Sequence, residues 1–225
     1  MELLLVRHAQ PSWSVDSIAQ VDPGLTETGQ RQAELVAHRF RNESFDRIVV
    51  STAQRAQETA VPVRATLNSV RTDDREWLHE IHMPGSWQGS PSDEVNRTLV
   101  ASRLRTRNEW WEGMPGGETF HDFHARVTIG VNAELAELGV EQNDQGLWQV
   151  PGDAPRLLFI AHAGTNSVVL GHLLGLDPEP WEWERFDSGH ASITLLRTRP
   201  IASGHIFSLL RFSDVSHLPD TLVSH

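Results

Sequence analysis

Reactive side chains follow three short apolar runs of the sequence. The runs are Leu3 to Val6 before Arg7 and His8, Ile48 to Val50 before Ser51 and Arg55, and Leu157 to Ala161 before His162. Runs that are apolar on successive residues are typical of strands buried on both faces of a parallel sheet, and ligands bind at the carboxyl ends of such strands. We therefore expect these histidines and arginines to converge in one crevice, where their donors and charges favour an anionic ligand.

This combination of side chains favours phosphoryl transfer. A neutral imidazole can attack phosphorus with one nitrogen while a carbonyl or carboxylate holds the N–H of the other, and either His8 or His162 could take this role. Arg7 and Arg55 can hold the oxygens of the transferring group. The leaving oxygen also needs a proton donor, and Glu80 is the acidic candidate nearest to a strand or loop end.

Two pairs of histidines raise the alternative of a metal site. His79 with His82, and His121 with His124, are spaced so that both rings of a pair can share one helix face. No carboxylate or third histidine at ligand spacing completes either set, and the chain has no cysteine to supply a thiolate. We expect no metal and no cofactor.

The elements that must position these residues can be read from hydrophobic spacing. An amphipathic helix is indicated by Ala33, Val36, Ala37 and Phe40, with Thr26 as its N-cap. Ser51 to Gln54 fits the S-x-x-Q form of a capping box, which predicts a helix with Arg55 in its first turn. The remaining predicted elements are a long helix marked by Phe120, Phe123, Val127, Val131, Leu135 and Leu138, a helix over Ser167 to Leu174, and strands over Ser192 to Arg197 and Ile206 to Phe212.

Repetition of strand, turn and helix predicts an α/β fold, a three-layer α/β/α sandwich around a mostly parallel sheet with right-handed crossovers. Residues 1–225 are expected to form a single domain. Residues 82–118, rich in Trp, Pro, Gly and Arg, predict a lid-like insertion over the sheet edge, in which Trp110 and Trp111 could wall the substrate pocket. Residues 139–155 are expected to be a polar loop without a role in the site.

Composition limits the possible partners. The net charge of −11 argues against nucleic acid and against an anionic membrane surface, because either would demand a basic face. No apolar run is long enough to span a membrane, and the first residues predict a strand rather than a signal peptide. We expect a cytoplasmic protein and a small phosphorylated substrate, with a homo-oligomer possible. All 19 basic residues are arginine, the side chain best shaped for bidentate contact with phosphate.

Several motifs together resemble the histidine phosphatase superfamily, which includes the cofactor-dependent phosphoglycerate mutases and related phosphatases. They are Leu4-Leu5-Val6-Arg7-His8-Ala9, Leu25-Thr26-Glu27-Thr28-Gly29-Gln30, Ser51 through Arg55 to Ala60, Leu78-His79-Glu80, His162-Ala163-Gly164, Pro115-Gly116-Gly117-Glu118 and Ser216-His217-Leu218. The resemblance spans nearly the whole chain in the right order. It is the order of the set, rather than any single motif, that makes the resemblance specific.

The resemblance implies a role for each candidate residue. His8 would accept the phosphoryl group, and Arg7, Arg55 and His162, with the backbone at Ala163, would hold the phosphate. Glu80 would donate a proton to the leaving group and later act as the base for water. No metal is implied.

The sequence departs from the family pattern at a few positions. Ala9 and Ala163 stand where glycine is usual, and Gln10 and Ser14 stand where many mutases have Glu and Asn. The spacing from Glu80 to the following Gly-Ser-Trp-Gln-Gly segment is one residue longer than expected. Glu80 is therefore the site residue whose assignment the pattern supports least.

The sequence favours a metal-independent phosphatase that hydrolyses small phosphomonoesters through a phosphohistidine on His8. One alternative is a cofactor-dependent phosphoglycerate mutase, but the chain has no tyrosine, and the insertion lacks the adjacent arginine pair followed by tyrosine that we look for in mutases. Another alternative is a non-catalytic protein that only binds phosphorylated ligands. The substrate itself cannot be read from the sequence, because specificity should lie in residues 82–118.

Overall fold

An eight-stranded sheet forms the centre of the protein in the computed structural model, which describes all 225 residues. The strand order is β5-β4-β8-β1-β9-β10-β7-β6. The strands are β1 (Glu2–Arg7), β4 (Arg47–Ser51), β5 (Thr72–Arg75), β6 (Glu141–Gln142), β7 (Trp148–Gln149), β8 (Arg156–Ala161), β9 (Ile193–Ile201) and β10 (Gly204–Asp214). The first four in the order are parallel and the other four join antiparallel, so the sheet is mixed.

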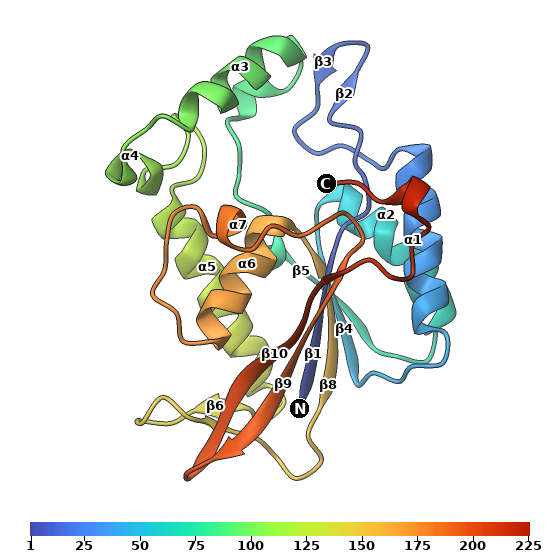
Figure 1. The fold of residues 1–225 in the computed structure, drawn as a ribbon, viewed down its shortest axis with the longest axis vertical. Coiled ribbons are helices and arrows are strands. Elements are labelled where there is room, and N and C mark those ends of the chain that lie inside the picture. The colour runs from blue at the N-terminus through green and yellow to red at the C-terminus, as the bar shows by residue number, and fades with distance from the viewer.

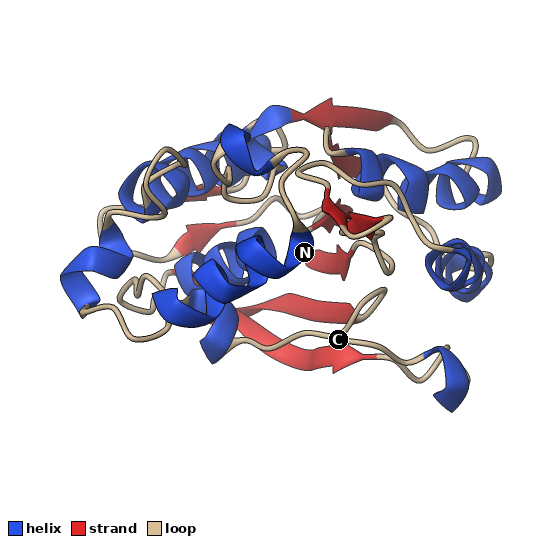
Figure 2. Ribbon diagram, turned by 90° about the horizontal axis from the view of Figure 1, so that it is seen from above, coloured by secondary structure: helices blue, strands red, loops and turns tan.

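Helices cover both faces of this sheet (Figures 1 and 2). On one face lie α1 (Glu27–Phe40) and α2 (Gln54–Thr66), and on the other lie α5 (Phe120–Ala136) and α6 (Ala163–Leu173). Shorter segments are α7 (Glu182–Arg185) and the 3-10 turns η1 (Glu76–Leu78) and η3 (Asp220–Leu222). The predicted three-layer α/β/α arrangement is confirmed.

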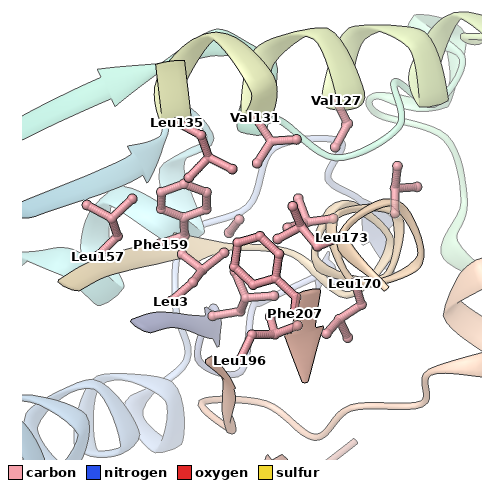
Figure 3. Packing of buried hydrophobic residues seen from close by; sticks show 14 of the residues in the cluster. Leu3, Val127, Val131, Leu135, Leu157, Phe159, Leu170, Leu173, Leu196 and Phe207 are labelled. Carbon is pink, nitrogen blue, oxygen red and sulfur yellow. The ribbon is translucent and has the colours of Figure 1, made fainter. Parts of the chain in front are cut away.

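Two buried apolar clusters, one on each face, hold the layers together. Successive residues of β1 serve opposite clusters: Leu3 and Leu5 pack toward α5 and α6, while Leu4 and Val6 pack toward α1 and α2. Figure 3 shows the first cluster, in which α5, α6 and the sheet interdigitate. Strands buried on both faces need apolar residues at every position, which explains the continuous apolar runs of the sequence.

The N-cap predicted for α1 is confirmed, whereas the one predicted for α2 is wrong. Thr26 caps α1 as predicted, accepting a hydrogen bond from the Gly29 amide at 3.0 Å. The capping box predicted at Ser51 is wrong, because Ser51 is the last residue of β4 and the N-cap of α2 is Ala53, which makes no side-chain cap bond. Asp22 from a distant loop instead accepts from the Gln54 amide at 3.0 Å.

Residues 82–118 extend above the sheet edge (Figure 1). They contain the turn η2 (Gly85–Trp87) and the helices α3 (Ser92–Ser102) and α4 (Arg107–Trp111). The segment is tied to the small hairpin of β2 (Ser14–Val15) and β3 (Ile18–Ala19) by backbone bonds such as Ala19 N–H to the Ser90 carbonyl at 2.9 Å. No residue of α3 is buried, which is typical of a cover rather than of a core element.

Residues 139–155 are not the plain loop that was expected. They form the β6–β7 hairpin, and β7 pairs with β10 through Trp148 opposite His205. A turn at Asn143 to Gly146 closes the hairpin, and Gly146 has a φ of +75°, a conformation that favours glycine. Trp148 is buried in the cluster next to α5 and α6, so the hairpin completes the core there. None of the helices combines the length and apolar character needed to cross a membrane.

Candidate active site

Two histidines meet at the carboxyl end of the parallel strands. His8 follows β1 and His162 follows β8, and the His8 amide donates to the Ala161 carbonyl at 2.8 Å. The two ring centroids lie 5.1 Å apart, and both side chains are buried. Adjacent parallel strands in register therefore place these two rings side by side.

The His8 ring is oriented by its own backbone. Its Nδ1 lies 2.8 Å from the Ala9 carbonyl oxygen, which can only accept, so Nδ1 carries the proton and Nε2 keeps a free lone pair. The Ala9 amide in turn donates to the Thr59 hydroxyl at 3.0 Å, which fixes this turn against α2. Burial, followed by the charges of Arg55 and Arg7, holds the pKa of His8 well below its ordinary value. His8 is thus a neutral imidazole with one nucleophilic nitrogen.

His162 is held by Ser51 at the end of β4. The Ser51 hydroxyl lies 2.7 Å from His162 Nε2 and also accepts from the Ala53 amide at 3.3 Å. A hydroxyl that already accepts can donate its proton to Nε2, which leaves the imidazole proton on Nδ1. This Nδ1 is buried and has no partner in the chain. Burial, then the charge of Arg55, keeps the pKa of His162 well below its usual value, so the ring is a neutral donor.

Arg7 is oriented by the segment before β9. Its Nη1 donates to the Ser188 carbonyl, and its Nη2 lies 3.1 Å from Nε2 of His190. Arginine can only donate, so His190 accepts there and directs its Nδ1 proton to the Ser224 hydroxyl at 3.0 Å. Burial, then the charge of Arg7, lowers the pKa of His190 to about 3, which keeps it in this accepting form.

Arg55 is fixed from the opposite side. Its Nη1 donates to Asp22 at 3.2 Å, and its guanidinium stacks over the Trp13 ring at 4.8 Å from the centroid. Asp22 also holds the N-terminus of α2, so one carboxylate fixes both the helix and the side chain in its first turn. Arg55 is 2% exposed, and its burial lowers its pKa from the ordinary arginine value, although a guanidinium remains charged.

Several donors of these residues lack an acceptor in the chain. The Nε atoms of Arg7 and Arg55 and Nδ1 of His162 are all buried without a hydrogen-bond partner. The first N–H groups of α6, which begins at Ala163, have no intrahelical acceptor, and that of Gly164 donates to Glu80. Buried donors are nearly always paired in native structures, so this cluster is suited to a ligand with several acceptor oxygens. A phosphoryl group meets that requirement.

Glu80 joins the same centre from the segment after η1. Its Oε2 accepts from the Gly164 amide at 2.8 Å, and its Oε1 accepts from the Ile81 amide at 3.1 Å. A Cβ atom at Gly164 would lie 2.4 Å from Glu80 Oε1, so only glycine there lets the carboxylate approach α6. The one-residue-longer spacing noted in the sequence follows Glu80 and leaves this contact in place.

The two histidine pairs for which a metal site was considered make contacts that do not involve a metal. His79 and His82 stack at 4.6 Å, and His82 Nδ1 lies 3.1 Å from Glu118, while His121 stacks on Trp111 at 4.4 Å. No group of three or more histidine, aspartate or glutamate side chains is arranged to hold a metal ion. The donor set at the centre of the site, of guanidiniums and neutral imidazoles, is suited to an anion.

Four residues of the site were not found from the sequence. They are Trp13, Asp22, Ser51 in its contact with His162, and His190. His190 precedes β9, which runs antiparallel to β1, so the start of β9 lies at the same edge as the ends of the parallel strands. The Gly189-His190 pair before a predicted strand was therefore a usable signal. Nothing local marks Trp13 or Asp22.

A cavity of about 320 Å³ opens beside Arg55 and Glu80. Its walls come from the β2–β3 hairpin, η2 and α3, and a second cavity of about 390 Å³ continues toward α4 and shares Trp13, Glu80 and Leu99 with the first. Trp110 lines the second cavity, whereas Trp111 packs against the core residue Phe120. Residues 82–118 therefore supply one wall of the space beside Arg55 and Glu80.

Comparison with known proteins shows the family to which the sequence is similar. The family model of the histidine phosphatase superfamily (branch 1) matches residues 3–203. The glucosyl-3-phosphoglycerate phosphatase of Mycobacterium tuberculosis is 32% identical over 182 residues, which cover 80% of this chain and 78% of that protein. A probable phosphoglycerate mutase GpmB of Yersinia enterocolitica is 30% identical over 184 residues, covering 79% and 77%.

Solved structures share the fold of this chain. A mycobacterial glucosyl-3-phosphoglycerate phosphatase solved with VO3 aligns with a TM-score of 0.70 at 27% identity, covering 94% of this chain and 98% of that one. YhfR of Bacillus stearothermophilus aligns with a TM-score of 0.73 at 24% identity, covering 96% and 98%, a likeness that bears on the fold alone.

Proposed function

Because the chain belongs to branch 1 of the histidine phosphatase superfamily, whose members use a phosphohistidine intermediate, we propose that it hydrolyses small phosphomonoesters through a phosphohistidine on His8, without a metal. One observation carries the proposal. The proton of His8 is fixed on Nδ1 by the Ala9 carbonyl, which leaves Nε2 as a nucleophile beside buried donors that have no partner. Glucosyl-3-phosphoglycerate phosphatases among its relatives support hydrolysis as the reaction.

In the first half of the reaction, Nε2 of His8 attacks phosphorus and the bond from phosphorus to the ester oxygen breaks. Arg7, Arg55 and His162 hold the three non-bridging oxygens, whose charge changes as the bond breaks, and these donors need no reorganisation because they are already fixed. Glu80 in its acid form gives its proton to the leaving oxygen, so that an alcohol departs.

In the second half, Glu80 acts as a base. Its carboxylate takes a proton from water, and the oxygen of that water attacks the phosphorus of phosphohistidine. The bond between phosphorus and Nε2 breaks, inorganic phosphate leaves, and His8 regains its free lone pair. Glu80 ends in the acid form with which the next cycle begins.

Trapping the intermediate tests the nucleophile. Incubation with a 32P-labelled phosphomonoester and rapid denaturation should leave a phosphoenzyme that is stable in base and labile in acid, as a phosphoramidate is. His8→Ala should abolish it, whereas His162→Ala should reduce it without changing its acid lability. Full labelling of the His8→Ala variant would assign the nucleophile to His162 and contradict the proposed role of His8.

Mutase activity is the second candidate, because the GpmB relatives are about as similar as the phosphatases. A mutase must grip the carboxylate of its acceptor with free cations, but three of the four arginines of residues 82–118 are engaged elsewhere. Arg103 pairs with Glu184, Arg107 pairs with Glu179, and Arg105 donates to the Gly113 carbonyl. Arg97 lies on the outer side of α3, in a shallow hollow.

The two activities separate in one assay. We expect phosphate release from simple monoesters with no need for a bisphosphoglycerate primer, and little conversion between 3- and 2-phosphoglycerate. A primer-dependent mutase rate well above the hydrolysis rate would favour the mutase and leave His8 in its role. Absence of turnover of p-nitrophenyl phosphate at any pH would instead indicate a protein that only binds phosphorylated ligands.

A further inference from the structure

Building on the proposed function, we propose that the group esterified to the phosphate is uncharged and largely apolar, and that a carboxylate on this group is selected against. The cavity beside Arg55 and Glu80 is where that group must lie, because both residues line it, and they are the proposed phosphate contact and the proposed proton donor to the ester oxygen. Its volume of about 320 Å³ is at the lower end of the range of small-molecule pockets, about 300 to 1,000 Å³.

Apolar side chains make up half of the cavity lining. Trp13 stands on the hairpin side, Trp87, Val95 and Leu99 stand on the lid side, and Ile81 and Met83 lie beside Glu80. Of these, Trp13 is 48% exposed and Leu99 is 36% exposed, so large apolar side chains of this cavity are open to solvent. Exposed apolar surface concentrated around a reactive centre is typical of a binding site for an apolar group.

The charges of the cavity lining also disfavour a carboxylate on the substrate. Arg55 is the only arginine of the lining. It pairs with Asp22, and in the proposed mechanism it binds the phosphate. The carboxylate in the lining is Glu80, and the remaining polar side chains are uncharged or histidine. A carboxylate on the substrate would lie in this cavity without a free counter-charge, at a cost that the apolar walls increase.

The adjoining cavity does not supply the missing cation. Arg103 and Arg105 line it, but Arg103 pairs with Glu184 at 2.8 Å and Arg105 donates to the backbone carbonyls of Gly113 and Glu109. Glu118 and Glu184 also line this space. Both arginines are therefore already bonded within the protein, and the two glutamates add negative charge, so a substrate carboxylate gains little there.

An isosteric pair of substrates tests the inference. 4-Carbamoylphenyl phosphate and 4-carboxyphenyl phosphate have the same shape and differ by one charge, so kcat/KM for the carbamoyl compound should be higher by at least about tenfold. Phenyl phosphate should resemble the carbamoyl compound. Phosphate release is measured for all three, at an ionic strength low enough to keep the charge unscreened.

Two variants of α3 localise the effect. Leu99→Arg places a cation on the cavity wall and should bring the two kcat/KM values within about threefold of each other, through a faster reaction of the carboxylate. Val100→Arg adds the same charge one residue later, on the outer face of the helix, where the side chain is 68% exposed and lines only the outer hollow. It should leave the ratio of the parent protein unchanged.

The possible outcomes distinguish this inference from the function on which it rests. Equal or faster hydrolysis of the carboxylate by the parent protein, or equal effects of the two variants, would overturn the apolar assignment while leaving the phosphatase in place. Failure to release phosphate from any of the three esters, with no phosphoenzyme on His8, would overturn both.

Discussion

Three neutral histidines, each held by a different partner, define the centre of the site. His8 is oriented by a backbone carbonyl, His162 by the Ser51 hydroxyl, and His190 by the guanidinium of Arg7. Burial is the main reason why the pKa of each lies below the ordinary histidine value. The proposed nucleophile, His8, is therefore neutral at neutral pH, and we expect loss of activity in mild acid to come from groups other than these rings.

Gly164 is the residue whose replacement should report most directly on Glu80. In Gly164→Ala the new methyl group would meet the Glu80 carboxylate at 2.4 Å and displace it from α6. Loss of a positioned general acid costs on the order of a hundredfold in kcat. The loss should be large for alkyl phosphates and small for p-nitrophenyl phosphate, because p-nitrophenolate leaves without a proton.

Gly152→Ala is the matched control, since a methyl group there meets nothing within 4 Å. Activity of this variant should equal that of the parent protein for both substrates. If Gly164→Ala slows the alkyl and p-nitrophenyl esters equally, the substitution acts on the phosphate donors, and the proton-donor role of Glu80 loses its support.

For single residues, the sequence predicted the candidate site residues at the ends of the main strands. It missed the residues that hold those side chains in place. Arg7 ends β1, and His8 and His162 directly follow β1 and β8, so the topology alone brings them to one edge. Trp13 and Asp22 lie in a loop whose path is set by packing against Arg55 and α2, which no local pattern encodes. Partners of this kind depend on long-range geometry, and sequence spacing does not carry that information.

Among the elements, α3 and α5 are helices with opposite surroundings. Helix α5 buries a stripe of apolar residues against the sheet, including Phe123, Val127 and Val131, whereas α3 buries none of its residues. A helix that makes few buried contacts opens locally at a small free-energy cost. Helix α3, which forms one wall of the cavity, is thus held less stably than α5.

Hydrogen exchange should reveal this difference. Amides of α3 are expected to exchange by local opening, at least about tenfold faster than those in the middle of α5, which open only with the core. Mass spectrometry of peptic peptides from the two helices measures both in one sample. Equal protection of α3 and α5 would show that the lid opens only with the core, contrary to what its contacts indicate.

The predictions of elements succeeded or failed for identifiable reasons. Buried strands and the α5 helix were found because hydrophobic spacing follows directly from burial. The capping box at Ser51 failed because the strand continues through this residue and its hydroxyl turns to His162 instead. The β6–β7 hairpin was missed because two-residue strands are too short to show alternation.

At the scale of the whole molecule, the site lies where the two halves of the sheet join. Strand β1 pairs in parallel with β8 and antiparallel with β9. The parallel half contributes His8 and His162 from strand ends, and the antiparallel half contributes His190 from a strand start. A purely parallel sheet would have had no strand beginning at this edge, and Arg7 would lack its histidine partner.

Burial of neutral histidines should make the fold sensitive to mild acid. The pKa of His190 is about 3 in the folded protein and about 6.5 in the unfolded chain. Between these two pH values the unfolded chain therefore binds one proton more than the folded protein at this residue. Stability therefore falls as pH drops below about 6.5, by about 1.4 kcal/mol per pH unit for one such histidine. Urea unfolding at pH 7.5, 6 and 5 measures the slope, which His190→Asn should reduce.

The exposed His38 supplies the control for this experiment. His38→Asn removes a histidine from the surface of α1 and should leave the slope of stability against pH as in the parent protein. An unchanged slope in His190→Asn would mean that His190 takes up a proton without unfolding, in conflict with its role as an acceptor for Arg7.

The absence of buried residues in α3 bears on how such a protein can acquire new substrates. Substitutions at exposed positions usually change the free energy of unfolding by less than about 0.5 kcal/mol, whereas losses in the two apolar clusters cost several times more. The cavity wall formed by Val95 and Leu99 belongs to neither cluster. Selection can therefore alter the pocket one residue at a time without approaching the stability threshold, while the histidines and arginines stay fixed. Diversification of substrates around an unchanged catalytic centre is the evolutionary outcome that this architecture makes easy.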